Sequence, residues 1–274
     1  AMARLLLLHG PNLNLLGEAI LGQQEASRRL AGTMALLARE DVEYVSLKVS
    51  SVVAPHNVWD FDDAVDHIVT ALLPLYRIAT GAAATGTTKF INLDMEEYRD
   101  LDLTLEVFTR LLQRPEFFGL EAGIVLQAYL PEALEAREKL QHWADARVAA
   151  GGAPVKVRLV KGANLPMEKV QAELHGWPQA PLHTKIATDA NYLRVLDYSL
   201  DPQRLESVGI GIASHNLFHI ALAHQWLQTR GLSRQNVDFE ALLGMGQAEM
   251  AAVARTVGPL RLYTPVVAPE NFDA

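Results

Sequence analysis

The chain has 274 residues, of which 50% are hydrophobic and 20% charged, and its formal net charge is −8. This length predicts one large domain or two small ones with a substantial core, and the acidic balance disfavours a nucleic-acid-binding protein. The absence of cysteine excludes disulfides, zinc-thiolate sites and cysteine nucleophiles, and it fits a cytoplasmic protein. The apolar run at residues 5–8 is too short to span a bilayer and lacks the pattern of a signal peptide.

The first third of the chain alternates predicted strands and helices. Residues 4–16 are expected to form one or two short strands broken at Gly10 and Pro11, and residues 44–50 form the next strand after a helix at 24–39. Residues 61–78 have the apolar period of a helix, in which Pro74 predicts a kink or an early end. Residues 79–88 resemble a phosphate-binding loop but lack its Lys-Ser/Thr pair, so a mobile surface loop is expected.

The remaining two thirds repeat the same alternation. Strands are predicted at 90–93, 123–127, 155–161, 183–185, 208–213, 237–243 and 261–265, most of them followed by a helical pattern. About eight repeats of strands that are apolar on both faces predict a parallel (β/α)8 TIM-type barrel, a single domain over residues 1–274. An open doubly wound sheet is the alternative. The two Gly-x-Gly pairs, at 209–211 and 244–246, lack the strand-turn-helix context of a dinucleotide fingerprint.

Polar and charged residues recur at or near the C-terminal ends of the predicted strands, where a parallel barrel carries its chemistry. They are Glu18, Lys48, Asp94, Gln127, Arg158, Lys161, Lys185, His215 and Asn216. Four of them are cations, and the two acids can pair with only two, so the surplus positive charge predicts an anionic ligand such as a phosphate, a pyrophosphate or a carboxylate. The alternative is that several are exposed rim charges, Lys48 among them.

Two other kinds of site are weighed and rejected. His215 and His219 lie four residues apart, but no third ligand is evident and His219 is expected to face solvent, so no metal is predicted. No Gly-x-Ser-x-Gly elbow for a serine nucleophile is present.

Several segments, in order along the chain, resemble the flavin-dependent proline dehydrogenases, in particular the dehydrogenase domain of bifunctional proline utilization A proteins. They are Leu-Leu-Gly-Glu-Ala (15–19), Val-Ser-Leu-Lys-Val-Ser (45–50), Lys-Phe-Ile-Asn-Leu-Asp-Met-Glu-Glu-Tyr-Arg-Asp-Leu (89–101), Gly-Ile-Val-Leu-Gln-Ala-Tyr-Leu (123–130), Val-Arg-Leu-Val-Lys-Gly-Ala-Asn (157–164), Thr-Asp-Ala-Asn-Tyr (188–192), Ala-Ser-His-Asn-Leu (213–217) and Leu-Tyr-Thr-Pro-Val (262–266). The resemblance covers residues 13–273.

This resemblance implies a barrel that binds FAD and oxidises L-proline to Δ1-pyrroline-5-carboxylate, with hydride transfer to flavin N5. Electrons would pass to a membrane quinone, which implies a peripheral membrane contact. The first alternative is a barrel core that binds flavin or an anion but cannot hold proline. The second is a barrel lyase that acts on a phosphorylated substrate.

The resemblance also assigns roles to individual residues. The catalytic residues implied are Lys48, Asp94, Arg158, which would lie near flavin N5, and Tyr263. Substrate contacts are implied for Lys48, Leu159, Tyr263 and Glu18. Cofactor contacts are implied for Asp94, Met95, Val125, Gln127, Arg158, Val160, Lys161, Gly162, Ala163, Thr184, Lys185, His215 and Asn216.

The sequence departs from the family pattern at both ends. The family has a final helix over the barrel mouth, with a tyrosine and an arginine pair that clamps the proline carboxylate, and the sequence ends at Ala274 before it. Glu18 resembles the ion-pair partner of one of those arginines. Residues 1–12 are expected to be an atypical leader, similar to the start of type II dehydroquinases, but nothing beyond residue 17 continues that likeness.

Overall fold

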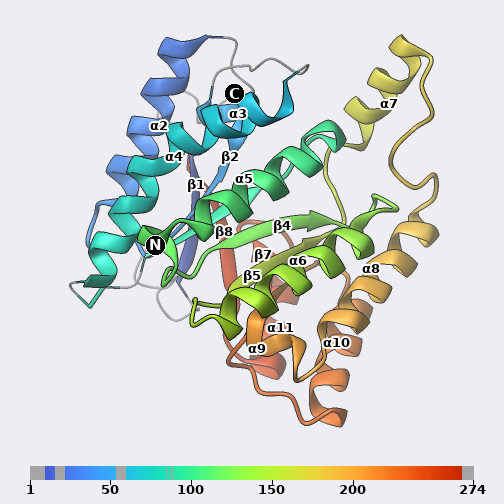
Figure 1. Cartoon of the computed structure of the whole chain (residues 1–274). Coiled ribbons are helices and arrows are strands. Elements are labelled where there is room, and N and C mark those ends of the chain that lie inside the picture. The colour runs from blue at the N-terminus through green and yellow to red at the C-terminus, as the bar shows by residue number, and fades with distance from the viewer. Residues whose placement is uncertain (1–9, 16–21, 54–59, 85, 88, 267–274) are drawn as a thin grey trace.

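Eight parallel strands close into a barrel in the computed structural model, which describes residues 10–15, 22–53, 60–84, 86–87 and 89–266 (Figure 1). Each strand pairs with the next one in sequence, and β8 pairs with β1 in register from Pro11 opposite Leu262 to Leu15 opposite Val266. The predicted TIM-type barrel is therefore confirmed. The strands are β1 (Pro11–Leu15), β2 (Tyr44–Lys48), β3 (Phe90–Asp94), β4 (Gly123–Gln127), β5 (Val155–Val160), β6 (Val208–Ala213), β7 (Val237–Leu242) and β8 (Arg261–Val266).

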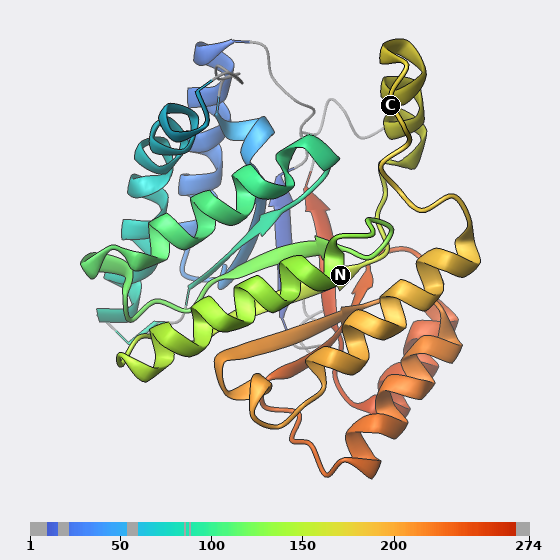
Figure 2. The same ribbon diagram turned by 45° about the vertical axis from the view of Figure 1, so that its right-hand side comes forward.

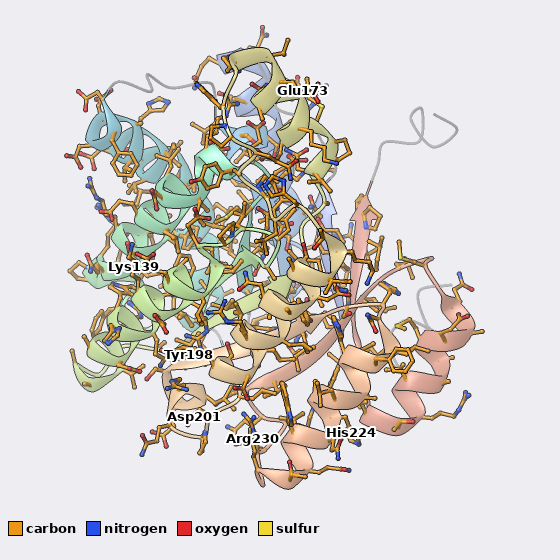
Figure 3. All side chains as sticks on the ribbon, turned by 90° about the vertical axis from the view of Figure 1, so that its right-hand side faces the viewer. Lys139, Glu173, Tyr198, Asp201, His224 and Arg230 are labelled. Atoms are coloured by element: carbon orange, nitrogen blue, oxygen red, sulfur yellow. The ribbon has the colours of Figure 1, made fainter. Side chains whose placement is uncertain are left out.

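Helices surround the barrel and present polar side chains outward, such as Lys139 and Glu173 (Figure 3). They are α2 (Gln23–Leu37), α3 (Val49–Val52), α4 (Phe61–Ala84), α5 (Leu101–Gln113), α6 (Ala133–Ala149), α7 (Leu165–His175), α8 (Lys185–Ser199), α9 (Arg204–Ser207), α10 (Leu217–Thr229) and α11 (Gln247–Val257), with the 3-10 turns η1 (Tyr98–Asp100) and η2 (Pro115–Phe117). None of the helices within these described ranges combines the length and apolarity needed to cross a bilayer.

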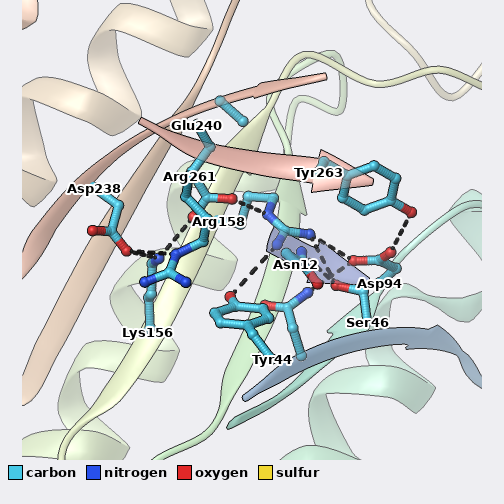
Figure 4. A network of polar contacts seen from close by, with 12 residues as sticks. Asn12, Tyr44, Ser46, Asp94, Lys156, Arg158, Asp238, Glu240, Arg261 and Tyr263 are labelled. Carbon is cyan, nitrogen blue, oxygen red and sulfur yellow. Dashed lines mark hydrogen bonds and ion pairs between the residues drawn. The ribbon is translucent and has the colours of Figure 1, made fainter. Parts of the chain in front are cut away.

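The apolar core lies between the strands and the helices, whereas the barrel interior holds polar side chains. Because successive side chains of a strand point to opposite faces, β5 divides its residues between the two regions. Val157 and Leu159 are fully buried in the apolar core, while Lys156 and Arg158 join the polar network inside the barrel (Figure 4). Strand β5 therefore contributes apolar side chains to the outer core and cations to the barrel interior.

Helix α7 differs from the other long helices because none of its residues is buried. It projects away from the barrel (Figure 2). It begins after Asn164 and ends at Gly176, whose φ of 66° is the left-handed conformation that glycine adopts without strain.

The structure corrects two expectations about secondary structure. Helix α4 continues through Pro74 to Ala84, so residues 79–84 are its last turns and not a loop, and Ala79 is fully buried there. Residues 183–185 form no strand, because Thr184 is the N-cap of α8 and its side chain accepts a hydrogen bond from the Ala187 amide at 3.1 Å. Of the predicted leader, residues 1–9 lie outside the described residues, while Pro11 and Asn12 belong to β1.

Candidate active site

A cavity of about 610 Å3 opens at the C-terminal ends of the strands, a volume in the range of small-molecule sites. Many of the predicted site residues line it. They are Lys48, Asp94, Met95, Val125, Gln127, Arg158, Val160, Lys161, Gly162, Ala163, His215, Asn216 and Tyr263. Strand ends contributed by distant parts of the sequence thus form one site.

Arg158 is the central cation of the cavity floor and is only 3% exposed. Its Nη1 donates to Asp94 Oδ1 at 2.9 Å, and its Nε donates to Glu240 Oε2 at 2.6 Å (Figure 4). Its guanidinium also lies 5.3 Å from the centre of the Tyr263 ring. Burial alone would lower the pKa of Arg158, but the carboxylates of Glu240 and Asp94 raise it above its ordinary value. Arg158 is therefore a fixed, permanent charge.

Asp94, at the end of β3, accepts hydrogen bonds from four side chains. Besides Arg158, it accepts from the Tyr263 hydroxyl at 2.9 Å, from Asn14 Nδ2 at 3.1 Å and from Asn92 Nδ2 at 2.8 Å. Burial raises the pKa of Asp94, and the Arg158 guanidinium opposes that rise. Burial and the neighbouring Asp94 carboxylate also raise the pKa of Tyr263. The tyrosine hydroxyl consequently stays protonated and donates to the carboxylate.

The predicted surplus of unpaired cations is wrong, because each predicted cation has a carboxylate partner. Lys48 Nζ lies 2.7 Å from Glu96 Oε1, and Arg158 pairs with both Asp94 and Glu240. Lys161 and Lys185 share the Asp189 carboxylate. The prediction counted only the acids at strand ends, and it missed acids in the loop after β3, on α8 and within β7.

Two buried polar atoms of the cavity wall have no hydrogen-bond partner among the residues that the structure describes, namely Gln127 Oε1 and His215 Nδ1. The other ring nitrogen of His215 accepts a hydrogen bond from the Leu242 amide at 3.0 Å. Burial lowers the pKa of His215, which favours the neutral imidazole. Buried polar atoms without partners are rare, so both are available to a bound ligand.

Gly162 brings the chain close to the aromatic ring of Tyr129. Its φ is 122°, and a Cβ atom at this position would lie 2.5 Å from the Tyr129 ring. The backbone supports the approach, because the Tyr129 amide donates to the Lys161 carbonyl at 2.7 Å. Glycine is therefore required for this wall of the cavity.

Several predicted site residues lie elsewhere. Leu159 is fully buried in the apolar core and does not line the cavity, because it points to the face of β5 opposite Arg158. Thr184 and Lys185 begin α8 outside the cavity lining, and Lys185 is an exposed side chain. Glu18 lies outside the described residues.

His219 was expected to face solvent, but it is only 6% exposed and stacks on Tyr192 with ring centres 5.2 Å apart. Within the described residues, no group of three or more His, Cys, Asp or Glu side chains is arranged to hold a metal ion.

Sequence reasoning missed part of the cavity. The missed lining residues are Glu96, Asn164, Ala213, Ser214, Glu240, Ala241, Leu242 and Met245. The sequence pattern could have indicated Glu240 as a site residue. Asp238 and Glu240 alternate with apolar residues in a predicted strand, which places two carboxylates on one face of the strand.

A closed parallel barrel with a cavity at the C-terminal strand ends, lined by charged and apolar side chains, is the architecture of TIM-barrel enzymes. The chain matches the family model described as "Proline dehydrogenase" over residues 8–273, and it belongs to that family.

Two related proteins are similar in sequence to this chain. The proline dehydrogenase of Deinococcus radiodurans is 28% identical over 258 residues, which cover 93% of this chain and 72% of that protein. The bifunctional protein PutA of Escherichia coli is 27% identical over 241 residues, which cover 84% of this chain. The chain spans only 17% of the length of that protein.

Solved structures are similar over almost the whole chain. Proline utilization A from Corynebacterium freiburgense superposes with a TM-score of 0.93 and 51% identity, covering 99% of this chain and 28% of that one. The Bdellovibrio bacteriovorus protein, solved after inactivation by N-propargylglycine, gives a TM-score of 0.88 and 29% identity over 97% of this chain and 29% of its own.

Proposed function

We propose that this chain is an FAD-dependent proline dehydrogenase that oxidises L-proline to Δ1-pyrroline-5-carboxylate. The observation that carries the proposal is the cavity of this family member, whose floor is built from Arg158, Asp94 and Tyr263. The reaction removes a hydride from the ring carbon beside nitrogen and a proton from the amine. A fixed cation and a hydrogen-bonded carboxylate suit a site that must orient a small zwitterion.

The residues of the cavity fit a flavin. Among the described residues, Gln127 Oε1 is a buried acceptor without a partner. Since His215 Nε2 accepts a hydrogen bond, Nδ1 carries the proton of the neutral ring and is a buried donor without a described partner. Gly162 permits close approach of the backbone. Lys161 lies at the cavity wall, where its ammonium would attract a pyrophosphate. FAD, when bound, supplies the acceptor for the hydride at its N5 atom.

The chain's own residues would bind and orient proline. Lys48 lies on the cavity wall as an ammonium paired with Glu96, and its charge would attract the proline carboxylate. The Tyr263 ring would pack on the proline ring, and its hydroxyl is held by Asp94. In the proposed cycle the electrons then pass to a quinone through a peripheral membrane contact, in the cytoplasm.

An anaerobic spectrum tests the proposal. The purified chain is titrated with FAD and then given L-proline in the absence of oxygen, with D-proline as the substrate control. We expect flavin uptake and bleaching of the visible flavin band by L-proline. A band that stays oxidised, or no flavin uptake, would refute the proposal.

A matched pair of lysine variants tests the cofactor assignment. Lys161→Met should weaken FAD binding because it removes the ammonium from the cavity wall. Lys139→Met removes an exposed ammonium on α6 and should leave FAD binding unchanged. Equal FAD affinities in the two variants would contradict the placement of the pyrophosphate at Lys161.

A further inference from the structure

Glu240 is a buried carboxylate that joins the cavity floor to the deeper interior of the barrel. It is 2% exposed and lines the cavity from β7. Its Oε2 accepts from Arg158 Nε at 2.6 Å, and its Oε1 accepts from Lys156 Nζ at 2.7 Å (Figure 4). Both carboxylate oxygens are thus occupied by cations on β5.

Strand β6 leaves room for this carboxylate. Gly211 lies opposite Arg158 in the β5–β6 register. A Cβ atom on Gly211 would lie 2.2 Å from Glu240 Oε1 and 3.1 Å from Lys156 Cε, so any larger residue would displace the ion pair. The Gly-x-Gly of residues 209–211, which lies inside β6 and lacks the context of a dinucleotide fingerprint, therefore has a structural role. Its second glycine provides the space in which Glu240 meets its two cations.

The ionised side chains of this network balance one another. The cations are Lys156, Arg158 and Arg261, and the carboxylates are Asp94, Asp238 and Glu240. Each charge contacts at least one of opposite sign, as burial requires. Removing only the Glu240 charge would leave one uncompensated positive charge directly beneath the cavity.

We infer that Glu240 is a positioning residue that holds Arg158 in place and keeps the net charge of this network at zero, and thereby lowers the reduction potential of the bound flavin. The part of this inference that concerns flavin rests on the proposed function. The physical reason is that an uncompensated cation near a flavin stabilises the negative charge gained on reduction.

Four variants separate charge from position. Glu240→Gln keeps the shape and removes the charge, so the flavin potential should become more positive. Lys156→Met/Glu240→Gln restores neutrality, so the potential should return toward that of the wild type. Glu240→Asp keeps the charge but shortens the side chain, so the potential should stay near the wild-type value while kcat falls. Asp238→Asn removes a charge that does not line the cavity, so its shift should be smaller.

The measurement is the midpoint potential of bound FAD, determined by equilibration with a redox dye. An unchanged potential in Glu240→Gln, or a double variant as shifted as the single one, would overturn the inference. If Glu240→Gln does not fold, the double variant decides the matter. It should fold with a near wild-type potential, and its failure to do so overturns the inference.

A readout without flavin separates this inference from the proposed function. Melting temperatures are measured for the FAD-free wild type, Glu240→Gln, Lys156→Met and the double variant. The double variant should lose less than the sum of the two single losses, because the two groups are in contact. Additive losses overturn the positioning role. If the variants show this coupling but the wild-type protein binds no FAD, the proposed function is refuted and the positioning role of Glu240 is not.

Discussion

Gly162→Ala is expected to damage both the stability of the fold and the cavity wall. The glycine has a φ of 122°, and a Cβ atom there would lie 2.5 Å from the ring of Tyr129. Tyr129 cannot yield easily, because it is 3% exposed and its amide is hydrogen-bonded to the Lys161 carbonyl.

The cost has two parts. A non-glycine residue in an unfavourable backbone conformation costs about 1–3 kcal/mol, and overpacking of a buried ring adds about 1–3 kcal/mol. Gly162→Ala should therefore lower the free energy of unfolding by about 2–6 kcal/mol. Gly176→Ala is the matched control. It also has a positive φ, of 66°, but no atom of the described part of the chain lies within 4 Å of its added Cβ, so only the backbone part applies.

The assay is urea unfolding followed by tryptophan fluorescence, combined with FAD titration of each variant. In the background of Tyr129→Ala, the steric part of the Gly162→Ala cost should disappear and the backbone part should remain. FAD affinity should fall in Gly162→Ala and not in Gly176→Ala. If Gly162→Ala costs no more than Gly176→Ala, or costs the same in both backgrounds, the close contact with Tyr129 does not determine the choice of glycine.

Three further predictions concern other parts of the barrel. Burial, and then the neighbouring Glu97, raises the pKa of Asp100 from 3.8 to about 6. Ionisation of Asp100 therefore lowers the free energy of unfolding as pH rises from about 4 to about 6, by at most about 3 kcal/mol. Above this window Asp100→Asn should be more stable than the wild type in urea unfolding. Equal stability of the two proteins at pH 8 would contradict this. Lys48→Met should raise the KM for proline about tenfold by removing one charged contact, in steady-state assays in which Lys139→Met behaves as wild type. Arg147→Met should lower the free energy of unfolding by about 3–5 kcal/mol, because Arg147 donates to five backbone carbonyls; a loss as small as that of Lys139→Met would contradict this.

The sequence determined the barrel and most of the cavity wall. Apolar strands at regular spacing, each followed by a helix, predicted the parallel barrel, because only a sheet covered on both faces buries such strands. The position of a residue at a strand end then predicted much of the cavity lining, since parallel strands bring those ends to one face. Lys48, Asp94, Gln127 and His215 were found in this way.

Local sequence was insufficient where neighbours in space decide the structure. Helix α4 continues beyond Pro74 because its later residues are buried against the core, which no local propensity records. Residues 183–185 lead into helix α8 and form no strand, because a short stretch becomes a strand only if a neighbouring strand pairs with it. Leu159, next to Arg158, faces the helices because successive side chains in a strand alternate.

The charges of the site are the clearest case of what only the tertiary structure decided. The sequence shows the cations Lys48, Arg158 and Lys161, but it does not show their partners. Register across β5, β6 and β7 brings Glu240 to Arg158, although 82 residues separate them. Electrostatic energy depends on distance in space and on burial, and sequence separation reports neither, so ion pairing inside the barrel was fixed only by the closed fold.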